Sequence, residues 1–222
     1  MGANLMSLAQ SGGKFLKLYG DGKMARTLPY DAEVEWLESN GEQYVETNYI
    51  PRSIDRIIAR YVVYQKDIPG NLVFASKTGA WNALPNYWVF LKMQYTTYQI
   101  WAFSNYQDIA KHVYYGSVSE CDLDMVNKRI AVYKEGDAPA YDRIEVGVES
   151  ENQLPIQLFP KGQKDLARTR IMKFEAIRNG EKVADIIAVR KDGVGYMYDR
   201  VSGQLFRNAG TGAFVIGPDK TT

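Results

Sequence analysis

The sequence predicts an all-β protein in which two antiparallel sheets pack as a sandwich. Three observations lead to this fold class. Many short runs alternate apolar and polar residues with the period of a β-strand, and clusters of turn-forming residues separate them at regular spacing. No segment of ten or more residues shows a helical period. This combination is typical of a β-sandwich rather than of a fold that alternates strands and helices.

The first strong strand signal lies at residues 56–64, which read RIIARYVVY. Alternation places Ile57, Ala59, Tyr61 and Val63 on one face, as a half-buried pleated strand requires. Further strands are expected at residues 87–98 and 99–103, as one strand or a hairpin pair. Others are expected at residues 129–134, ended by Glu135–Gly136–Asp137, and at 155–159.

The clearest local signal comes late in the chain. Residues 170–177 and 182–189 flank Asn179–Gly180, a dipeptide that readily supplies the two positive φ angles of a type I′ turn. A second tight turn is expected at residues 199–203, between strands at 196–198 and 204–206. Both segments therefore predict antiparallel hairpins.

Residues 1–30 differ from the rest, because they are rich in glycine and hold one short apolar run from Phe15 to Tyr19. We expect one strand at most in this stretch. It is interpreted either as a flexible or strand-swapped N-terminal arm, or as a docking segment that orders against a neighbouring subunit. The sandwich domain is expected to cover residues 31–222.

Composition excludes several functional classes. Among 222 residues, 45% are hydrophobic, and 27 Lys and Arg nearly balance 26 Asp and Glu. This balance argues against nucleic-acid binding and against a polybasic membrane-surface site. A single cysteine and a single histidine exclude a disulfide framework, a cysteine-based zinc site and an HExxH metal motif. We expect no cofactor and no metal.

Residues 120–124 read ECDLD, and alternation would place Glu120, Asp122 and Asp124 on one face. Paired carboxylates of this kind serve glycosidases, and carboxylates also bind calcium. The final Glu of the glycosidase spacing is missing, however, and residues 117–127 resemble a polar loop edge. We therefore favour a solvated acidic turn over a catalytic or calcium site. His112 and Cys121 lack the neighbours that a catalytic triad or a reactive thiol needs.

Aromatic residues gather between residues 81 and 115, and this is the best binding signal. Aromatic rings can stack on sugars while nearby amides bond their hydroxyl groups, but alternating aromatics also fill the space between two sheets. Core packing, a subunit interface and glycan binding are all compatible with the pattern. The candidate site residues are Trp81, Tyr87, Trp88, Tyr95, Tyr98 and Trp101.

Two stretches resemble a known family. Residues 35–49 read EWLESNGEQYVETNY, and the second stretch runs from Ile171 to Pro218, with Asn179–Gly180, Tyr198–Asp199, Gly203, Phe206, Asn208, Gly210, Gly212 and Phe214 at the family's pattern positions. They are similar to the laminin-G-like, concanavalin A-like family found in gut bacteria and their tailed phages. Ala188 stands where that family usually has proline.

The resemblance implies a concanavalin A-like jelly roll from about residue 30 to residue 218. The matched glycines fit positions that need a positive φ or a close backbone approach, and the matched phenylalanines fit the core. These are structural roles, so the resemblance specifies a fold more than a chemistry.

We expect a non-enzymatic, tailed-phage virion accessory protein, such as a fibre or decoration protein, made in the host cytoplasm. The missing export signal, the N-terminal arm and the family's many phage structural proteins favour this interpretation. Its partners would be other virion proteins and further copies of itself, and a surface glycan is a further candidate ligand. The alternatives are a carbohydrate-binding module of a bacterial or phage protein and, less favoured, a laminarinase-like glycosidase.

Overall fold

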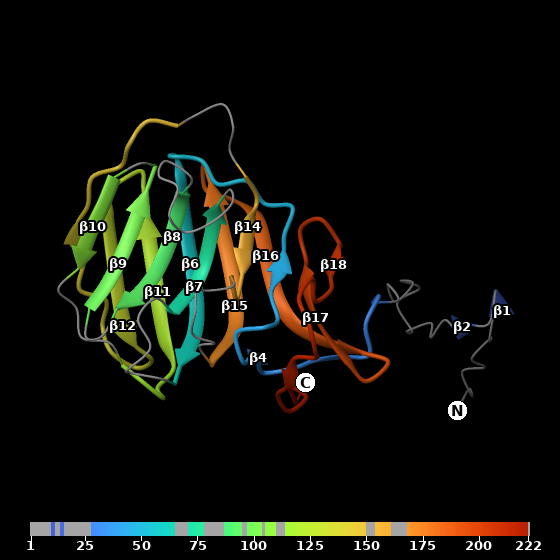
Figure 1. Cartoon of the computed structure of the whole chain (residues 1–222). Coiled ribbons are helices and arrows are strands. Elements are labelled where there is room, and N and C mark those ends of the chain that lie inside the picture. The colour runs from blue at the N-terminus through green and yellow to red at the C-terminus, as the bar shows by residue number, and fades with distance from the viewer. Residues whose placement is uncertain are drawn as a thin grey trace, which may run out of the picture.

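The computed structural model describes residues 10, 11, 14, 15, 28–64, 71–77, 87–94, 97–103, 105–109, 114–149, 154–160 and 168–221. Within these residues every element is a strand and every strand pair is antiparallel. Figure 1 shows two sheets stacked as layers. The chain is thus the two-sheet jelly-roll sandwich that the sequence predicts. No helix of the described part is long and apolar enough to cross a bilayer.

The larger sheet has 11 strands. The main path runs β13 (Asp142–Arg143), β12 (Arg129–Lys134), β11 (Ser119–Asp124), β6 (Asp55–Val63), β15 (Thr169–Arg178), β16 (Glu181–Lys191), β17 (Val194–Asp199) and β18 (Leu205–Phe206). Three short strands lie off this path: β3 (Ala32–Glu33) pairs with β16, and β4 (Leu37–Ser39) pairs with both β15 and β19 (Val215–Ile216).

The smaller sheet has six strands. Their order is β10 (Asn105–Ile109), β9 (Thr97–Ala102), β8 (Tyr87–Gln94), β7 (Asn71–Lys77), β14 (Ile156–Leu158) and β5 (Val45–Glu46). The opening stretch of the domain therefore contributes β4 to one sheet and β5 to the other.

The core lies between the two sheets. On β6 the predicted inward face is confirmed, because Ile57, Ala59, Tyr61 and Val63 are all at most 2% exposed. Phe174 on β15 meets Phe74 on β7 edge to face, with ring centroids 5.5 Å apart. Aromatic packing of this kind joins the inner faces of the two layers.

The β15–β16 hairpin forms where the sequence predicts it. Asn179 and Gly180 adopt φ angles of 52° and 82°, the positive pair that a type I′ turn requires. The turn before β18 also forms, since Gly203 donates its N–H to the Asp199 carbonyl at 2.8 Å. The expected strands at 87–98 and 99–103 are a hairpin, but its second strand begins earlier, at Thr97.

The prediction of an acidic turn at residues 117–127 is wrong. Residues 119–124 form β11, an interior strand of the larger sheet that pairs with β6 on one side and β12 on the other. Cys121 and Leu123 point into the core and are 0% exposed. The acids alternate with them on the outer face, where Arg56 and Arg129 bind Asp122 and Asp124 and the Tyr133 hydroxyl binds Glu120.

In the first thirty residues, β1 (Gln10–Ser11) and β2 (Lys14–Phe15) pair with each other, where the sequence suggested one strand at most. Tyr30 packs on the outer face of the larger sheet against Ile187, Val189 and Tyr198. Its ring meets Tyr198 edge to face at 4.9 Å. Of the other residues of the predicted arm, only Leu28 and Pro29 are described.

Candidate functional site

The six aromatic residues singled out from the sequence do not form one described surface. Trp81 and Tyr95 lie outside the described residues. Tyr87 and Trp88 belong to β8, and their side chains are outside the described part. Tyr98 and Trp101, both on β9, are described and face opposite sides of the sheet.

Tyr98 is a core residue. It is 1% exposed and lies against Tyr61 and Ser119 of the larger sheet. Burial raises the pKa of Tyr98 to about 12, and hydrogen bonding with these two neighbours only partly opposes the rise. We therefore leave Tyr98 out of the candidate site.

Trp101 lies on the outer face of the smaller sheet. Its indole packs against Leu72 and Ala75 and meets the exposed Tyr106 ring edge to face, with centroids 5.8 Å apart. On the same strand as Tyr106, Asp108 accepts hydrogen bonds from the Gln99 amide and the Tyr106 hydroxyl, both at 2.9 Å. This small patch combines aromatic and polar groups, but much of the indole is used in packing.

The three acids of β11 do share one face, and each is bonded to a neighbouring side chain. Arg56 donates two hydrogen bonds to Asp122, at 2.8 and 2.6 Å. Arg129 donates to Asp124 at 3.0 Å, and the Tyr133 hydroxyl donates to Glu120.

Its hydrogen-bond partners govern the titration of Asp124. Burial alone would raise the pKa of Asp124, but hydrogen bonds from Asn127 and Arg129 outweigh it and hold the pKa below its ordinary value. A general acid needs a raised pKa, so Asp124 is suited to a structural ion pair rather than to glycoside hydrolysis.

The structure does not support the other catalytic and metal-binding candidates from the sequence, each for a separate reason. Burial raises the pKa of the Cys121 thiol well above its ordinary value, which makes the thiol unreactive. His112 lies outside the described residues. Within the described ranges, no three His, Cys, Asp or Glu side chains are grouped so that they could hold a metal ion.

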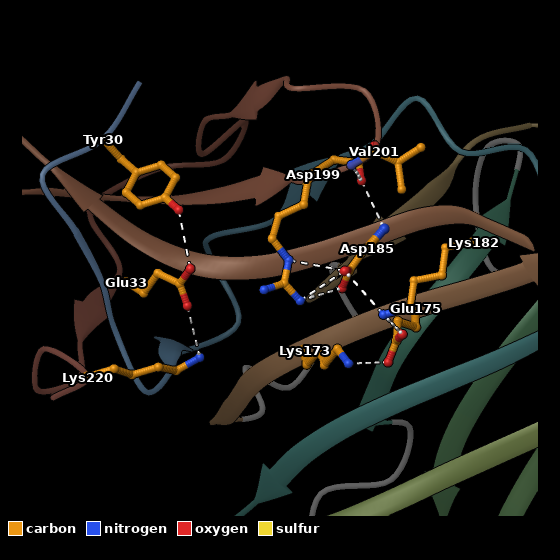
Figure 2. Close-up of polar contacts among 10 residues, drawn as sticks. Tyr30, Glu33, Lys173, Glu175, Lys182, Asp185, Asp199, Val201 and Lys220 are labelled. Atoms are coloured by element: carbon orange, nitrogen blue, oxygen red, sulfur yellow. Dashed lines mark hydrogen bonds and ion pairs between the residues drawn. The ribbon is translucent and has the colours of Figure 1, made fainter. Parts of the chain in front are cut away.

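The outer face of the larger sheet continues as a network of ion pairs across β15 and β16 (Figure 2). Glu175 bonds both Lys173 and Lys182, the latter at 2.5 Å. Asp185 bonds Lys182 at 3.3 Å and receives two hydrogen bonds from Arg200, at 3.1 and 3.0 Å. The carboxylates of this network therefore have cationic partners already.

A groove lies where the β5 edge of the smaller sheet meets β17 and β18 of the larger one. Val45 forms an isolated β-bridge with Asn208, and the Ala209 N–H donates to the Tyr44 carbonyl at 2.9 Å. Asn48 donates its side-chain amide to Gln204 at 3.0 Å. These contacts fasten the two sheets together along one edge of the sandwich.

We call this depression the edge groove, and its volume is about 700 Å³. Ligand pockets usually fall between about 300 and 1,000 Å³. The lining residues are Tyr44, Glu46, Tyr196, Gln204, Leu205, Phe206, Arg207, Asn208 and Ala209.

Strand alternation explains which side chains reach the edge groove. Val45 is 0% exposed in the core, so Tyr44 and Glu46 on either side of it face outward. Phe206 is likewise buried, which turns Arg207 toward solvent. The buried Val45 and Phe206 thus anchor the backbone of the groove. Glu46 and Tyr196 lie on strands, and Tyr44 and Arg207 lie next to strand ends.

The two charged groups of the edge groove have no charged partner among the described residues, whereas its amide side chains Gln204 and Asn208 are hydrogen-bonded to other residues. Within the described part of the chain, neither Glu46 nor Arg207 forms an ion pair, and the Tyr44 and Tyr196 hydroxyls have no hydrogen-bond partner. The one side-chain bond to Glu46 comes from Gln157, at 3.3 Å. The groove therefore offers two aromatic rings, a carboxylate and a guanidinium to a ligand.

Sequence reasoning missed the edge groove. Its residues come from the two family-like stretches, which were interpreted as structural because their buried positions carry the pattern. The signal that could have found them is the polar or aromatic residue beside each buried one: Tyr44 and Glu46 around Val45, and Arg207 after Phe206.

No protein-family model and no curated protein sequence matches this chain. Among solved structures, the chain is similar to a candidate carbohydrate-binding protein from Bacteroides ovatus, with a TM-score of 0.52 and 6% identity. That match covers 85% of this chain and 61% of the other, so the chain spans less than two thirds of its length. An alginate lyase of polysaccharide lyase family 7 aligns over 74% of this chain and 68% of its own, at 8% identity and a TM-score of 0.32. At such low identity, the first likeness shows a shared β-sandwich fold.

Proposed function

We propose that this protein binds carbohydrate without transforming it, and that the ligand occupies the edge groove. The observation that carries the proposal is the lining of the groove. Tyr44 and Tyr196 offer ring faces for the C–H faces of a sugar, while Glu46 and Arg207 can accept from and donate to its hydroxyl groups.

Two further observations support a binding role. The acids on β11, the best glycosidase candidates in the sequence, are bonded to arginine and tyrosine side chains instead of facing each other across a cleft. The candidate carbohydrate-binding protein with the same fold makes this ligand class a reasonable first choice. The predicted roles in a phage virion and in homo-oligomer assembly stay predictions from the sequence.

The test is a glycan array followed by isothermal titration with the best ligand, using the full chain. We expect Arg207→Gln to weaken binding at least tenfold, because it removes the one guanidinium among the described residues that line the groove. Arg143→Gln is the matched control, since Arg143 lies on β13 at the far edge of the sheet and is 84% exposed. This control should bind like the wild type, and the bound glycan should remain intact.

Trp101→Ala separates the groove from the aromatic patch on the smaller sheet. If Trp101→Ala abolishes binding while Arg207→Gln leaves it unchanged, the edge groove is not the site. Equal binding by Arg207→Gln and Arg143→Gln, or no glycan bound at all, would also overturn the proposal.

A further inference from the structure

A second group of unsatisfied donors lies on the larger sheet, where β4 pairs with β15. Glu38 on β4 stands opposite Arg170 on β15, and its side chain is only 5% exposed. Arg170 donates from Nε to one carboxylate oxygen at 2.5 Å, and Arg168 donates from Nε to the other at 2.5 Å. We call Glu38, Arg168 and Arg170 the guanidinium pair site.

Aromatic rings lie against the two guanidinium groups. The Arg170 Cζ lies 3.7 Å from the centroid of Trp36 and 5.0 Å from that of Tyr64, and the Arg168 Cζ lies 4.6 Å from the Tyr64 centroid. Gly217 packs so closely against Trp36 that a Cβ at position 217 would come within 2.8 Å of the indole. The donors are therefore held in place before any ligand arrives.

These two arginines share one carboxylate, and each contacts it through a single nitrogen, as Arg129 does with Asp124. Four other arginines bind a carboxylate through both Nε and Nη2: Arg56, Arg178, Arg190 and Arg200. Arg168 and Arg170 each use only Nε, so their Nη amino groups have no partner within the described residues. Two cations share one anion here, which leaves a net charge of +1.

We propose that the guanidinium pair site binds an oxyanion, either a carboxylate or a sulfate group. The planar fork of arginine matches the geometry of these groups, and two preoriented guanidiniums can hold one of them from two sides. Arg168 is 51% exposed at its side chain, so the site is open to solvent. The anion can be free in solution or carried by an acidic polysaccharide, and the two sources differ experimentally. This proposal does not depend on saccharide binding in the edge groove.

The direct test follows the arginine Nε–H resonances of the full chain by NMR during titration with sodium sulfate. Sodium chloride at equal ionic strength is the reference. We expect sulfate to shift the Arg168 and Arg170 resonances saturably, and chloride to leave them unchanged. A non-saturable shift, or the same shift with chloride, would show simple screening and would overturn the proposal.

Variants then test whether the planar guanidinium of Arg168, rather than its charge alone, binds the anion. Arg168→Gln should weaken sulfate binding at least fivefold, and Arg168→Lys should weaken it similarly, since lysine keeps the charge but lacks the paired donors. Arg143→Gln and Arg207→Gln should bind sulfate like the wild type. If Arg168→Lys binds normally, charge alone is responsible and the fork is disproved. Far-ultraviolet circular dichroism checks that each variant is folded. If a variant does not fold, the sulfate titration of the wild-type protein still tests the proposal.

A sulfated oligosaccharide and its desulfated form distinguish the two sources. If the sulfated form binds more tightly than inorganic sulfate and competes with it, while the desulfated form does not bind Arg168, the anion belongs to a polysaccharide. If inorganic sulfate binds and neither oligosaccharide displaces it, the site takes a free anion.

Discussion

The edge groove and the outer face of the larger sheet carry the same kinds of side chains, but they differ in whether those side chains are already paired. On the sheet face, Asp122 receives two hydrogen bonds from Arg56 and another from the Tyr141 hydroxyl. In the groove, Glu46 and Arg207 form no ion pair within the described residues.

This difference separates structural charges from charges that can recognise a ligand. A carboxylate with two cationic partners has few lone pairs left for a ligand, and moving its partners would expose an uncompensated charge. An unpaired group at a groove keeps its bonding capacity and contributes little to folding. We therefore expect substitutions of buried, paired carboxylates to lower stability, and substitutions of the unpaired groups in the groove to lower binding.

The largest expected effect is at Asp55, the most deeply buried of the paired acids, which lies on β6 on the inward side that Ile57 and Ala59 share. Its side chain is 0% exposed and accepts hydrogen bonds from the Tyr49 hydroxyl at 2.6 Å and from Arg178 at 2.7 and 2.9 Å. Asp55→Asn removes the negative charge and leaves Arg178 without its partner. We expect the free energy of unfolding in urea to fall by about 3–5 kcal/mol.

Asp219→Asn is the matched control, because Asp219 also receives two hydrogen bonds from one arginine, Arg190, but is 52% exposed. This variant should unfold like the wild type, since exposed pairs contribute little. If both variants unfold alike, burial of the paired charges does not determine their contribution, and the contrast with the groove is lost.

Local sequence pattern was sufficient for much of the fold. The alternation in β6 identifies its buried face, and Asn179–Gly180 identifies a hairpin because both φ angles are set within the turn itself. The strand β11 was missed because its acids look unfavourable for a strand unless their partners are known. Arg56 lies 66 residues before Asp122 in the sequence, so that compensation is invisible locally.

The candidate site was harder to predict for the same reason. Tyr44 and Asn208, which meet at the edge groove, are 164 residues apart. Periodicity within one segment says which side chains face outward, but not which outward faces lie together. Aromatic density drew attention to Trp101 and Tyr98, yet Tyr98 faces the core.

Gly210→Ala tests the groove side of this contrast, because Gly210 supports the edge groove rather than the outer face of the larger sheet. A Cβ at position 210 would lie 1.9 Å from the Glu42 carbonyl oxygen and 3.1 Å from a ring carbon of Tyr44. The backbone must shift, so we expect a loss of about 2–3 kcal/mol in unfolding free energy and weaker saccharide binding. Urea unfolding and isothermal titration measure the two effects.

Gly136→Ala is the control for the backbone. Gly136 has a φ of 92°, and a Cβ added there would have no neighbouring atom within 4 Å, so this variant carries conformational strain without a clash. It should be mildly destabilised and bind saccharide normally. Normal binding by Gly210→Ala would mean that the groove does not depend on the close approach of this loop to Tyr44.

The smallest of the three effects concerns pH and the network in Figure 2. Burial would raise the pKa of Asp185, but hydrogen bonds and charge from Arg200 and Lys182 outweigh it, so the folded pKa lies below the unfolded value. The ion pairs therefore contribute fully to stability above about pH 4, the ordinary pKa of an Asp, and this contribution is lost as pH falls through the folded pKa.

Asp185→Asn should lower the free energy of unfolding by about 1–2 kcal/mol at pH 7. The gap to the wild type should then narrow below pH 4 in urea unfolding curves. A gap that stays constant down to pH 2 would mean that the charge of Asp185 does not cause the difference, and that paired charge is not what distinguishes this face from the groove.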